Sequence, residues 1–322
     1  NRAIRGQAYN ADGTARGDEF LVNTTTEDRQ DDPSVTGLSD GGFVAIWEDF
    51  SQTGEDMSSG GLSEGGAIRG QTYNADGTVR GEEFLVNTTT EGGQSNPSVT
   101  GLSDGGFVAT WQDNSQTGAD TSGDAIRGQA FNADGTARGP EFLVNTTAED
   151  NQIDPSVAGL SDGGFVATWE DDSQTGGDTS STAIRGQAFN ADGTARGEEF
   201  LVNTTTEDDQ EAPSVTGLSN GGFVATWEDD SQTGADTSSG GMFGGDVGAV
   251  RGQAFNADGT ARGAEFLVNT TTEGFQGLPS VTGLSDGGFV ATWTDRSQTG
   301  GDEIRGQAFN ADGTARGAEF LV

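Results

Sequence analysis

Apolar and polar residues alternate along much of this chain in short runs. Phe223, Ala225 and Trp227 share one face of an extended segment, and Val224 and Thr226 share the other. Such alternation over about four to eight residues is typical of a half-buried β-strand. Pairs of these runs flank Ser-Asp-Gly-Gly or Asn-Ala-Asp-Gly, in which glycine supplies the positive φ of a tight turn. The pattern therefore predicts β-hairpins and an all-β chain.

The hairpins belong to a repeat. Segments that begin with Ile-Arg-Gly-Gln or Val-Arg-Gly-Gln start at intervals of 54–66 residues, at Ile4, Ile68, Ile126, Ile184, Val250 and Ile304. The phrase SVTGLSDGGFVATW, or a close variant, ends at Trp47, Trp111, Trp169, Trp227 and Trp293. Each full repeat therefore contains four strands. Five repeats and one extra half-repeat predict 22 strands.

Four-stranded units at this period predict a β-propeller, most simply one with five blades, because each sheet can bury its faces against the next. An open β-repeat array or a solenoid is the alternative, although solenoid rungs are usually shorter. We expect one repeat domain, residues 1–322. It comprises a half-repeat, 1–22, and five repeats at about 23–86, 87–144, 145–202, 203–268 and 269–322.

Composition narrows the chemistry. The chain has 15 positive and 52 negative residues, a net charge of −37, and neither cysteine nor histidine. Disulfides, thiolate catalysis, histidine acid–base chemistry and zinc sites of cysteine or histidine are therefore excluded. The negative field repels nucleic acid and anionic membranes and attracts cations. No apolar run approaches the roughly 18 residues of a membrane span, so we expect no membrane insertion.

An acidic loop follows each tryptophan, with the motif D-x-S-x-T-G-x-D. Calcium takes about six to eight oxygen ligands, which loops supply from alternating side chains with a glycine at the bend. The motif has oxygens at positions 1, 3, 5 and 8, and glycine at position 6. The predicted Ca²⁺ ligands are Asp49, Ser51, Thr53, Asp56, Asp113, Ser115, Thr117, Asp120, Asp171, Ser173, Thr175, Asp178, Asp229, Ser231, Thr233, Asp236, Asp295, Ser297, Thr299 and Asp302. Alternatively, the aspartate and serine only form Asx turns.

The length variation between repeats falls between each tryptophan and the next Arg-Gly-Gln, whereas the linker from Asn23 to Pro33 keeps 11 residues in its copies. Variable loops suit an exposed rim, because insertions there cost little. We therefore expect the aspartates to be exposed and calcium to bridge molecules through them. On this view Asp229→Asn with Asp236→Asn leaves the fold intact. We also expect a longer array, in which one terminal hairpin is left over or pairs with a neighbouring molecule.

The repeat also resembles a known class of protein. The run FNADGTARGAEFLVNTTTEGFQGLPSVTGLSDGGFVATW, residues 255–293, is similar to repeats of very large, secreted, adhesin-like proteins of marine bacteria, which often also carry hemolysin-type (RTX) calcium-binding repeats. The acidic loop resembles the calcium loops of FG-GAP-type propeller blades, with fewer carboxylates and its last ligand one place early. The resemblance implies a calcium-rich extracellular or cell-surface setting and names no catalytic residue.

Three functions fit these observations. The first is a calcium-stabilised structural or adhesive module, whose partners are other copies or domains of the same surface assembly, or an acidic polysaccharide. The second is a carbohydrate-binding propeller that uses the tryptophans, although their place at the end of alternating strands favours the core. The third is a glycosidase. Five equivalent repeats give five equivalent environments, whereas catalysis needs distinct acid and base roles, so we expect no enzyme.

Overall fold

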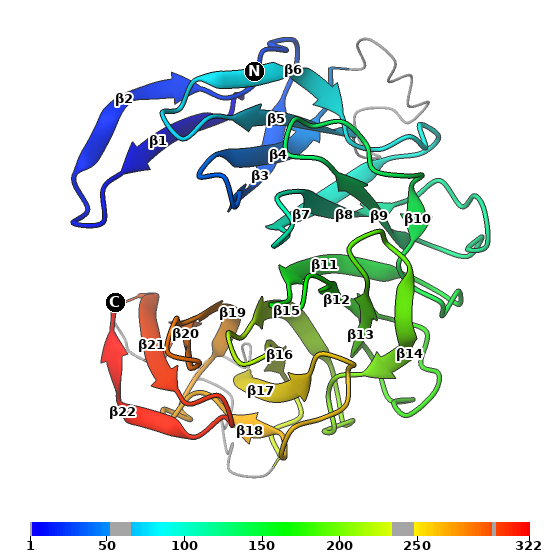
Figure 1. The fold of residues 1–322 in the computed structure, drawn as a ribbon. Helices are drawn as coiled ribbons and strands as arrows, with labels where there is room; N and C mark the ends of the chain where they lie inside the picture. Colours follow the sequence, from blue (N-terminus) through cyan, green and yellow to red (C-terminus); the bar gives the residue numbers. More distant parts are fainter. Residues whose placement is uncertain (1, 52–65, 234–247, 298–300) are drawn as a thin grey trace. The chain divides into compact units, whose positions relative to one another are not determined.

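The computed structural model describes residues 2–51, 66–233, 248–297 and 301–322. These residues form 22 β-strands and no helix, which confirms the predicted all-β class and strand number (Figure 1). The described part of the chain thus holds no helix long and apolar enough to cross a membrane. The chain divides into two compact units, Asn1–Val144 and Asn145–Val322, and each is considered by itself.

The first unit contains one two-stranded and two four-stranded antiparallel sheets. Its strands are β1 (Arg5–Tyr9) and β2 (Ala15–Leu21); β3 (Gln30–Gly37), β4 (Phe43–Asp49), β5 (Ala67–Tyr73) and β6 (Val79–Leu85); β7 (Gln94–Gly101), β8 (Phe107–Asp113), β9 (Ala125–Phe131) and β10 (Phe142–Leu143).

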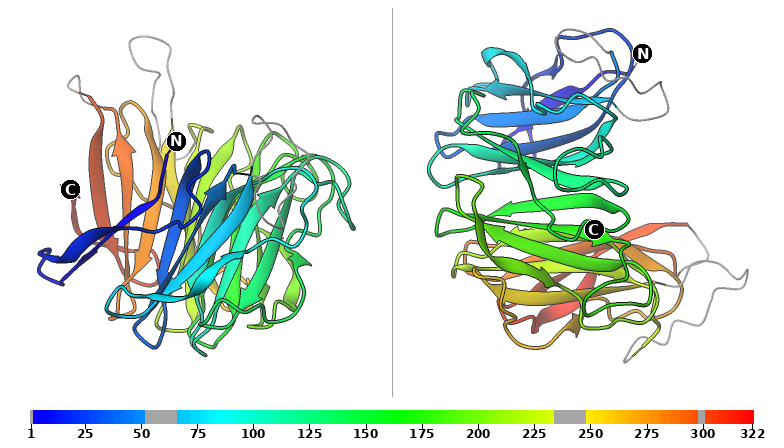
Figure 2. Two further views of the ribbon diagram at one scale, coloured as in Figure 1. Left: turned by 90° about the horizontal axis from the view of Figure 1, so that it is seen from above. Right: turned by 90° about the vertical axis from the view of Figure 1, so that its right-hand side faces the viewer.

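The second unit contains three four-stranded antiparallel sheets. Its strands are β11 (Gln152–Gly159), β12 (Phe165–Asp171), β13 (Ala183–Phe189) and β14 (Ala195–Leu201); β15 (Gln210–Gly217), β16 (Gly222–Asp229), β17 (Ala249–Asn256) and β18 (Phe266–Leu267); β19 (Gln276–Gly283), β20 (Phe289–Asp295), β21 (Glu303–Phe309) and β22 (Ala315–Leu321). Figure 2 shows strands of neighbouring sheets in this unit lying face to face.

Within each sheet the strands are hydrogen-bonded in chain order. A four-stranded sheet therefore consists of a first hairpin, such as β3–β4, and a second hairpin, such as β5–β6. The N-terminal pair β1–β2 has the sequence of a second hairpin and forms a sheet of its own. The described residues thus form six sheets in place of the five predicted blades. Five of the six are four-stranded, and the sixth is the hairpin β1–β2 by itself, the terminal hairpin that five repeats and a half-repeat leave over.

Neighbouring sheets pack through aromatic and β-branched side chains. The five tryptophans are at most 1% exposed, which confirms that they belong to the core. Phe107 and Phe131 stack within their sheet at 5.0 Å between ring centroids, and the other four-stranded sheets have an equivalent stacked pair, with Tyr73 as one member in the sheet β3–β6. Around Trp111, Val99 packs against Val44 and Ile46 of the preceding sheet. The second and third strands of a sheet, such as β12 and β13, are buried most deeply.

Candidate functional site

The first aspartate of each acidic loop ends the second strand of its sheet. Asp49, Asp113, Asp171, Asp229 and Asp295 are at most 1% exposed, so the prediction of an exposed rim is wrong for these five. Strand register explains their position, because Asp171 lies opposite Gln152 on β11 and opposite Ala183 on β13. Asp229 likewise is a buried residue of β16, so the exposed position from which we expected Asp229→Asn with Asp236→Asn to leave the fold intact is wrong for Asp229.

An arginine from the third strand reaches each of these aspartates. In the sheet β11–β14 the Nε of Arg185 donates to Oδ2 of Asp171. Its Nη1 donates to Oε1 of Glu199 at 3.3 Å, and its Nη2 donates to the carbonyl oxygen of Thr175 at 2.6 Å. Arg185 pairs with Trp169 in the register, so Asp171 is its diagonal neighbour. Arg69, Arg127, Arg251 and Arg305 make the same two ion pairs in their sheets.

The serine and threonine of the loop lie against the same arginine. The hydroxyl of Ser173 donates to Oδ2 of Asp171 at 2.8 Å and lies 2.9 Å from Oγ1 of Thr175. The loops of Ser115 with Thr117 and of Ser231 with Thr233 repeat these contacts. The structure therefore brings three of the four predicted ligand types together, but around a guanidinium group of the chain itself.

The second aspartate of the loop has other partners. Asp178 is buried and accepts hydrogen bonds from Nδ2 of Asn203 at 2.9 Å and from the backbone N–H of Ser180 at 3.1 Å. Asp120 is buried as well, whereas Asp302 is exposed and pairs with Arg296 at 3.1 Å. The predicted ligands Thr53, Asp56, Asp236 and Thr299 lie outside the described residues. Among the described residues no cluster of three or more acidic side chains could hold a metal ion, and calcium binding by these loops stays a prediction.

A glutamate clasp that the sequence analysis missed anchors the linker before each first hairpin. Oε2 of Glu199, on β14, accepts the backbone N–H of Thr146 at 2.6 Å, and Oε1 accepts the hydroxyl of Thr147. Burial opposes the ionisation of Glu199, but these hydrogen bonds outweigh it and hold its pKa below the usual value. The sequence could have indicated this contact, because both the Asn-Thr-Thr linker and the glutamate recur in all five repeats.

A second missed group joins neighbouring sheets. Oδ1 of Asn203 accepts the backbone N–H of Ile184, and its Nδ2 donates to Oε1 of Gln210 at 2.9 Å. Nε2 of Gln210 then donates to Oδ1 of Asp229 at 3.3 Å. The asparagine thus links β13 to the next sheet through buried polar groups. The hydrogen bonds of Asn203 and Gln210 offset the cost of burying their amide groups.

A glutamate after the tryptophan also joins sheets in three repeats. Oε1 of Glu170 accepts the backbone N–H of Ala212 at 2.6 Å, and Glu48 and Glu228 make the same contact with Asn96 and Leu278. These N–H donors lie in β-bulges and have φ between 49° and 52°, the left-handed region. The bulged residue differs in type between repeats, since Asp32, Asn96, Asp154, Ala212 and Leu278 occupy the equivalent position. Contact with a backbone N–H explains why many side chains are accepted there.

Burial raises the pKa of Glu170 to about 8, and Asp154, Glu211 and Asp172 add to the effect. A carboxyl with a raised folded-state pKa destabilises the fold as pH rises from its ordinary value of 4.5 through about 8. We expect Glu170→Gln to raise the free energy of unfolding above pH 8 by on the order of 1–2 kcal/mol and to leave it unchanged near pH 4. Urea unfolding across this range measures the difference. The exposed Glu198→Gln is the control, and an equal gain there would contradict the assignment.

No known family model matches the chain, and no curated protein matches it in sequence. Solved structures do match in fold. A protein of unknown function from Dyadobacter fermentans has 15% identity and a TM-score of 0.56, over 91% of this chain and 82% of that one. The GH93 α-L-arabinofuranosidase of Fusarium graminearum, in complex with arabinobiose, has 12% identity and a TM-score of 0.54, over 94% of this chain and 96% of that one. At these identities the likeness shows the fold alone, a propeller-like all-β repeat.

Proposed function

We propose that this chain is a non-catalytic structural or adhesive module of an extracellular or cell-surface protein, and that calcium stabilises it. The observation that carries the proposal is the Asp–Arg–Glu network, which takes the same form in all five repeats. It engages the acidic side chains with partners from the chain itself. A repeat built in this way presents a large, stiff surface and no differentiated reaction centre.

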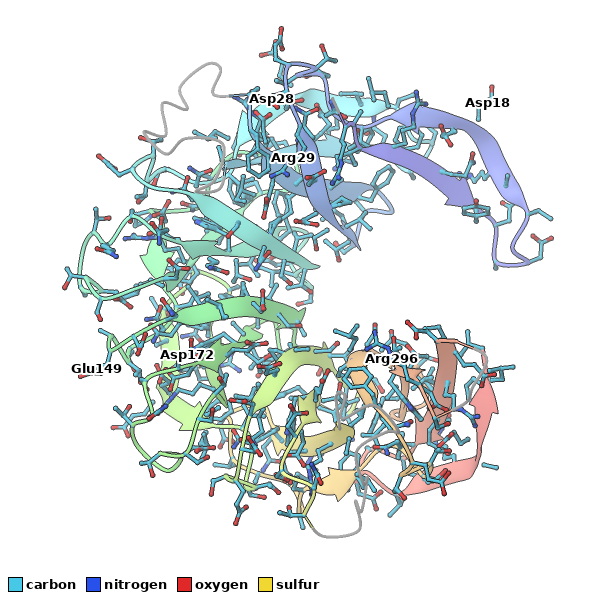
Figure 3. The ribbon with its side chains drawn as sticks, turned by 180° about the vertical axis from the view of Figure 1, so that it is seen from behind. Asp18, Asp28, Arg29, Glu149, Asp172 and Arg296 are labelled. Atoms are coloured by element: carbon cyan, nitrogen blue, oxygen red, sulfur yellow. The ribbon has the colours of Figure 1, made fainter. Side chains whose placement is uncertain are left out.

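The charge balance supports a role for cations. Nearly all the arginines are engaged in ion pairs, so the excess of carboxylates falls on the surface. Exposed examples are Asp18 on β2, Asp28, and Glu149 in the linker before β11, which Figure 3 shows among the side chains of the described residues. A net charge of −37 opposes close approach of two such surfaces at low salt. A divalent cation that bridges carboxylates would remove that barrier.

Calcium is therefore expected to raise the melting temperature and to promote association with other copies or with an acidic polysaccharide. A ligand that binds only the folded state stabilises it by about 2.7 kcal/mol per site at a hundredfold excess over Kd. Thermal unfolding and light scattering in calcium, magnesium and sodium chloride, at equal ionic strength, measure both effects. Reversal by chelator is the expected control.

The outcomes separate the alternatives. Equal stabilisation by sodium chloride would show that simple screening suffices and would remove calcium from the proposal. Magnesium should rescue poorly, because it demands a tighter octahedral geometry than calcium. If calcium changes neither the melting temperature nor the association state, the adhesive role is wrong as well. The carbohydrate-binding alternative has little support, because its candidate tryptophan platforms are buried.

A glycosidase is the second candidate, favoured by one local observation. Glu170 has a pKa of about 8 beside ionisable carboxyls, and a general acid in glycoside hydrolysis needs such a raised pKa. The fold likeness to an α-L-arabinofuranosidase is compatible with this role. Glu48 and Glu228 make the same backbone contact, however, which supports a structural role for all three. Turnover of aryl arabinofuranosides that Glu170→Gln abolishes would establish the enzyme, and its absence would favour the module.

A further inference from the structure

The turn of one first hairpin carries a different residue from its copies. In four repeats this turn reads Ser-Asp-Gly-Gly, and its aspartates are Asp40, Asp104, Asp162 and Asp286. In the fourth repeat it reads Ser-Asn-Gly-Gly, and Asn220 with Gly221 is the one Asn-Gly pair of the chain. An asparagine before glycine readily loses its side-chain amide, because glycine has no side chain to hinder attack by its backbone nitrogen. The fourth turn therefore combines a reactive pair with a position that is otherwise acidic.

The four aspartates are held by the same two kinds of donor. Oδ1 of Asp162 accepts the backbone N–H of Gly164 at 3.1 Å, and Oδ2 accepts Nη1 of Arg196 at 2.6 Å. The other three aspartates repeat both contacts. At Asp40 the arginine, followed by the backbone N–H, lowers the pKa of the carboxyl below its usual value. The turn and its arginine therefore form a binding place for a carboxylate.

Asn220 occupies the same place with an amide. Its Oδ1 accepts both the backbone N–H of Gly222 at 3.3 Å and Nη1 of Arg262 at 3.1 Å. One oxygen thus takes the two hydrogen bonds that Asp162 divides between its two oxygens. A carboxylate at position 220 would offer each donor its own oxygen and would pair the charge of Arg262.

We propose that Asn220 is a site of spontaneous deamidation, and that Arg262 and the backbone N–H of Gly222 promote the reaction. The Gly221 nitrogen gives up its proton and bonds to Cγ of Asn220. The bond from Cγ to Nδ2 breaks, and Nδ2 leaves with that proton as ammonia. Water then opens the cyclic imide, giving aspartate if it breaks the new bond and isoaspartate if it breaks the backbone bond. The net change consumes one water, releases one ammonia and needs no oxidant.

The contacts of Oδ1 explain the promotion. Negative charge develops on this oxygen as the nitrogen attacks, and donors already aimed at it stabilise the transition state. One contact opposes the reaction, because the backbone N–H of Gly221 donates to the carbonyl oxygen of Leu218 at 3.1 Å. Asn220 is exposed and lies in the turn, so local opening of that hydrogen bond suffices and the strands stay paired.

The test incubates the full chain in mildly alkaline buffer and locates the changes by peptide mapping with mass spectrometry. We expect Asn220 to lose its amide before any other asparagine, including the exposed Asn190, which precedes alanine. Isoelectric focusing should show one added negative charge, and the aged chain should migrate with the Asn220→Asp variant. An amide at Asn220 that survives as long as that of Asn190 would overturn the proposal.

Two variants separate promotion by the fold from the intrinsic reactivity of Asn-Gly. Arg262→Gln should slow the reaction of the folded chain by about tenfold, less than the loss of a donor in a water-excluded active site costs. In urea, the parent chain and this variant should react at the same rate, because the contact is then absent. Arg196→Gln, the same change in the third repeat, should leave the rate at Asn220 unchanged. Equal rates for folded Arg262→Gln and the folded parent would refute the promoting role.

Discussion

Replacing Arg185 with alanine should lower the free energy of unfolding of the second unit by about 3–5 kcal/mol, because it leaves a buried charge without its partner. The side chains of Asp171 and Glu199 are only 1% and 5% exposed, and both depend on this guanidinium group. Arg185→Lys keeps the charge but loses the planar fork that joins two carboxylates and the Thr175 carbonyl, so it should recover only part of the loss. Urea unfolding followed by tryptophan fluorescence measures these differences.

The matched control lies in the same sheet. Arg196 pairs with Asp162 at 2.6 Å, but their side chains are 26% and 43% exposed. Such surface pairs contribute about 0–1 kcal/mol, so Arg196→Ala should change stability little. Similar losses for Arg185→Ala and Arg196→Ala would contradict the central place that we give to the buried network. They would also favour cation binding by the acidic loop again, because the fold would then not need Arg185 to neutralise Asp171.

Replacing Gly101 with alanine should also destabilise the first unit, by about 1–3 kcal/mol or more. Its added Cβ atom would collide with the backbone oxygen of Gly37, and a backbone atom cannot move aside as the end of a flexible side chain can. The cost is the separation of two closely packed sheets. Thermal and urea unfolding of the variant provide the measurement.

Gly37→Ala is the paired control, at the equivalent position of the preceding repeat. Its Cβ atom meets nothing within 4 Å, so the change should stay within about 0.5 kcal/mol, as for most surface substitutions. The two substitutions are chemically identical and differ only in whether a neighbouring sheet covers the glycine. If both were equally destabilising, the cause would be the intrinsic preference of this strand position, and close approach of the sheets would not explain it.

The strand pattern was predictable because it depends on neighbours in the sequence. Alternation in Phe223–Trp227 and glycine at the turns determine the hairpins locally. The five similar repeats each give the same strand assignment. The burial of the tryptophans followed from the same alternation. The separate sheet β1–β2 is the terminal hairpin that the repeat count left over. The burial of Asp49 and its copies did not follow, because it depends on how whole sheets pack and no local pattern records that packing.

In the acidic loop, too, the sequence determined the local structure and the tertiary structure determined the partners. By itself the sequence determined that an aspartate, a serine, a threonine and a glycine recur in one short loop, which is enough to predict a compact polar turn. Only the tertiary structure decided that the cation facing Asp171 is Arg185, which lies 14 residues away on another strand. The physical reason is that a carboxylate can be neutralised by any positive group. Strand register, which is set by the packing of whole sheets, determines which positive group reaches it.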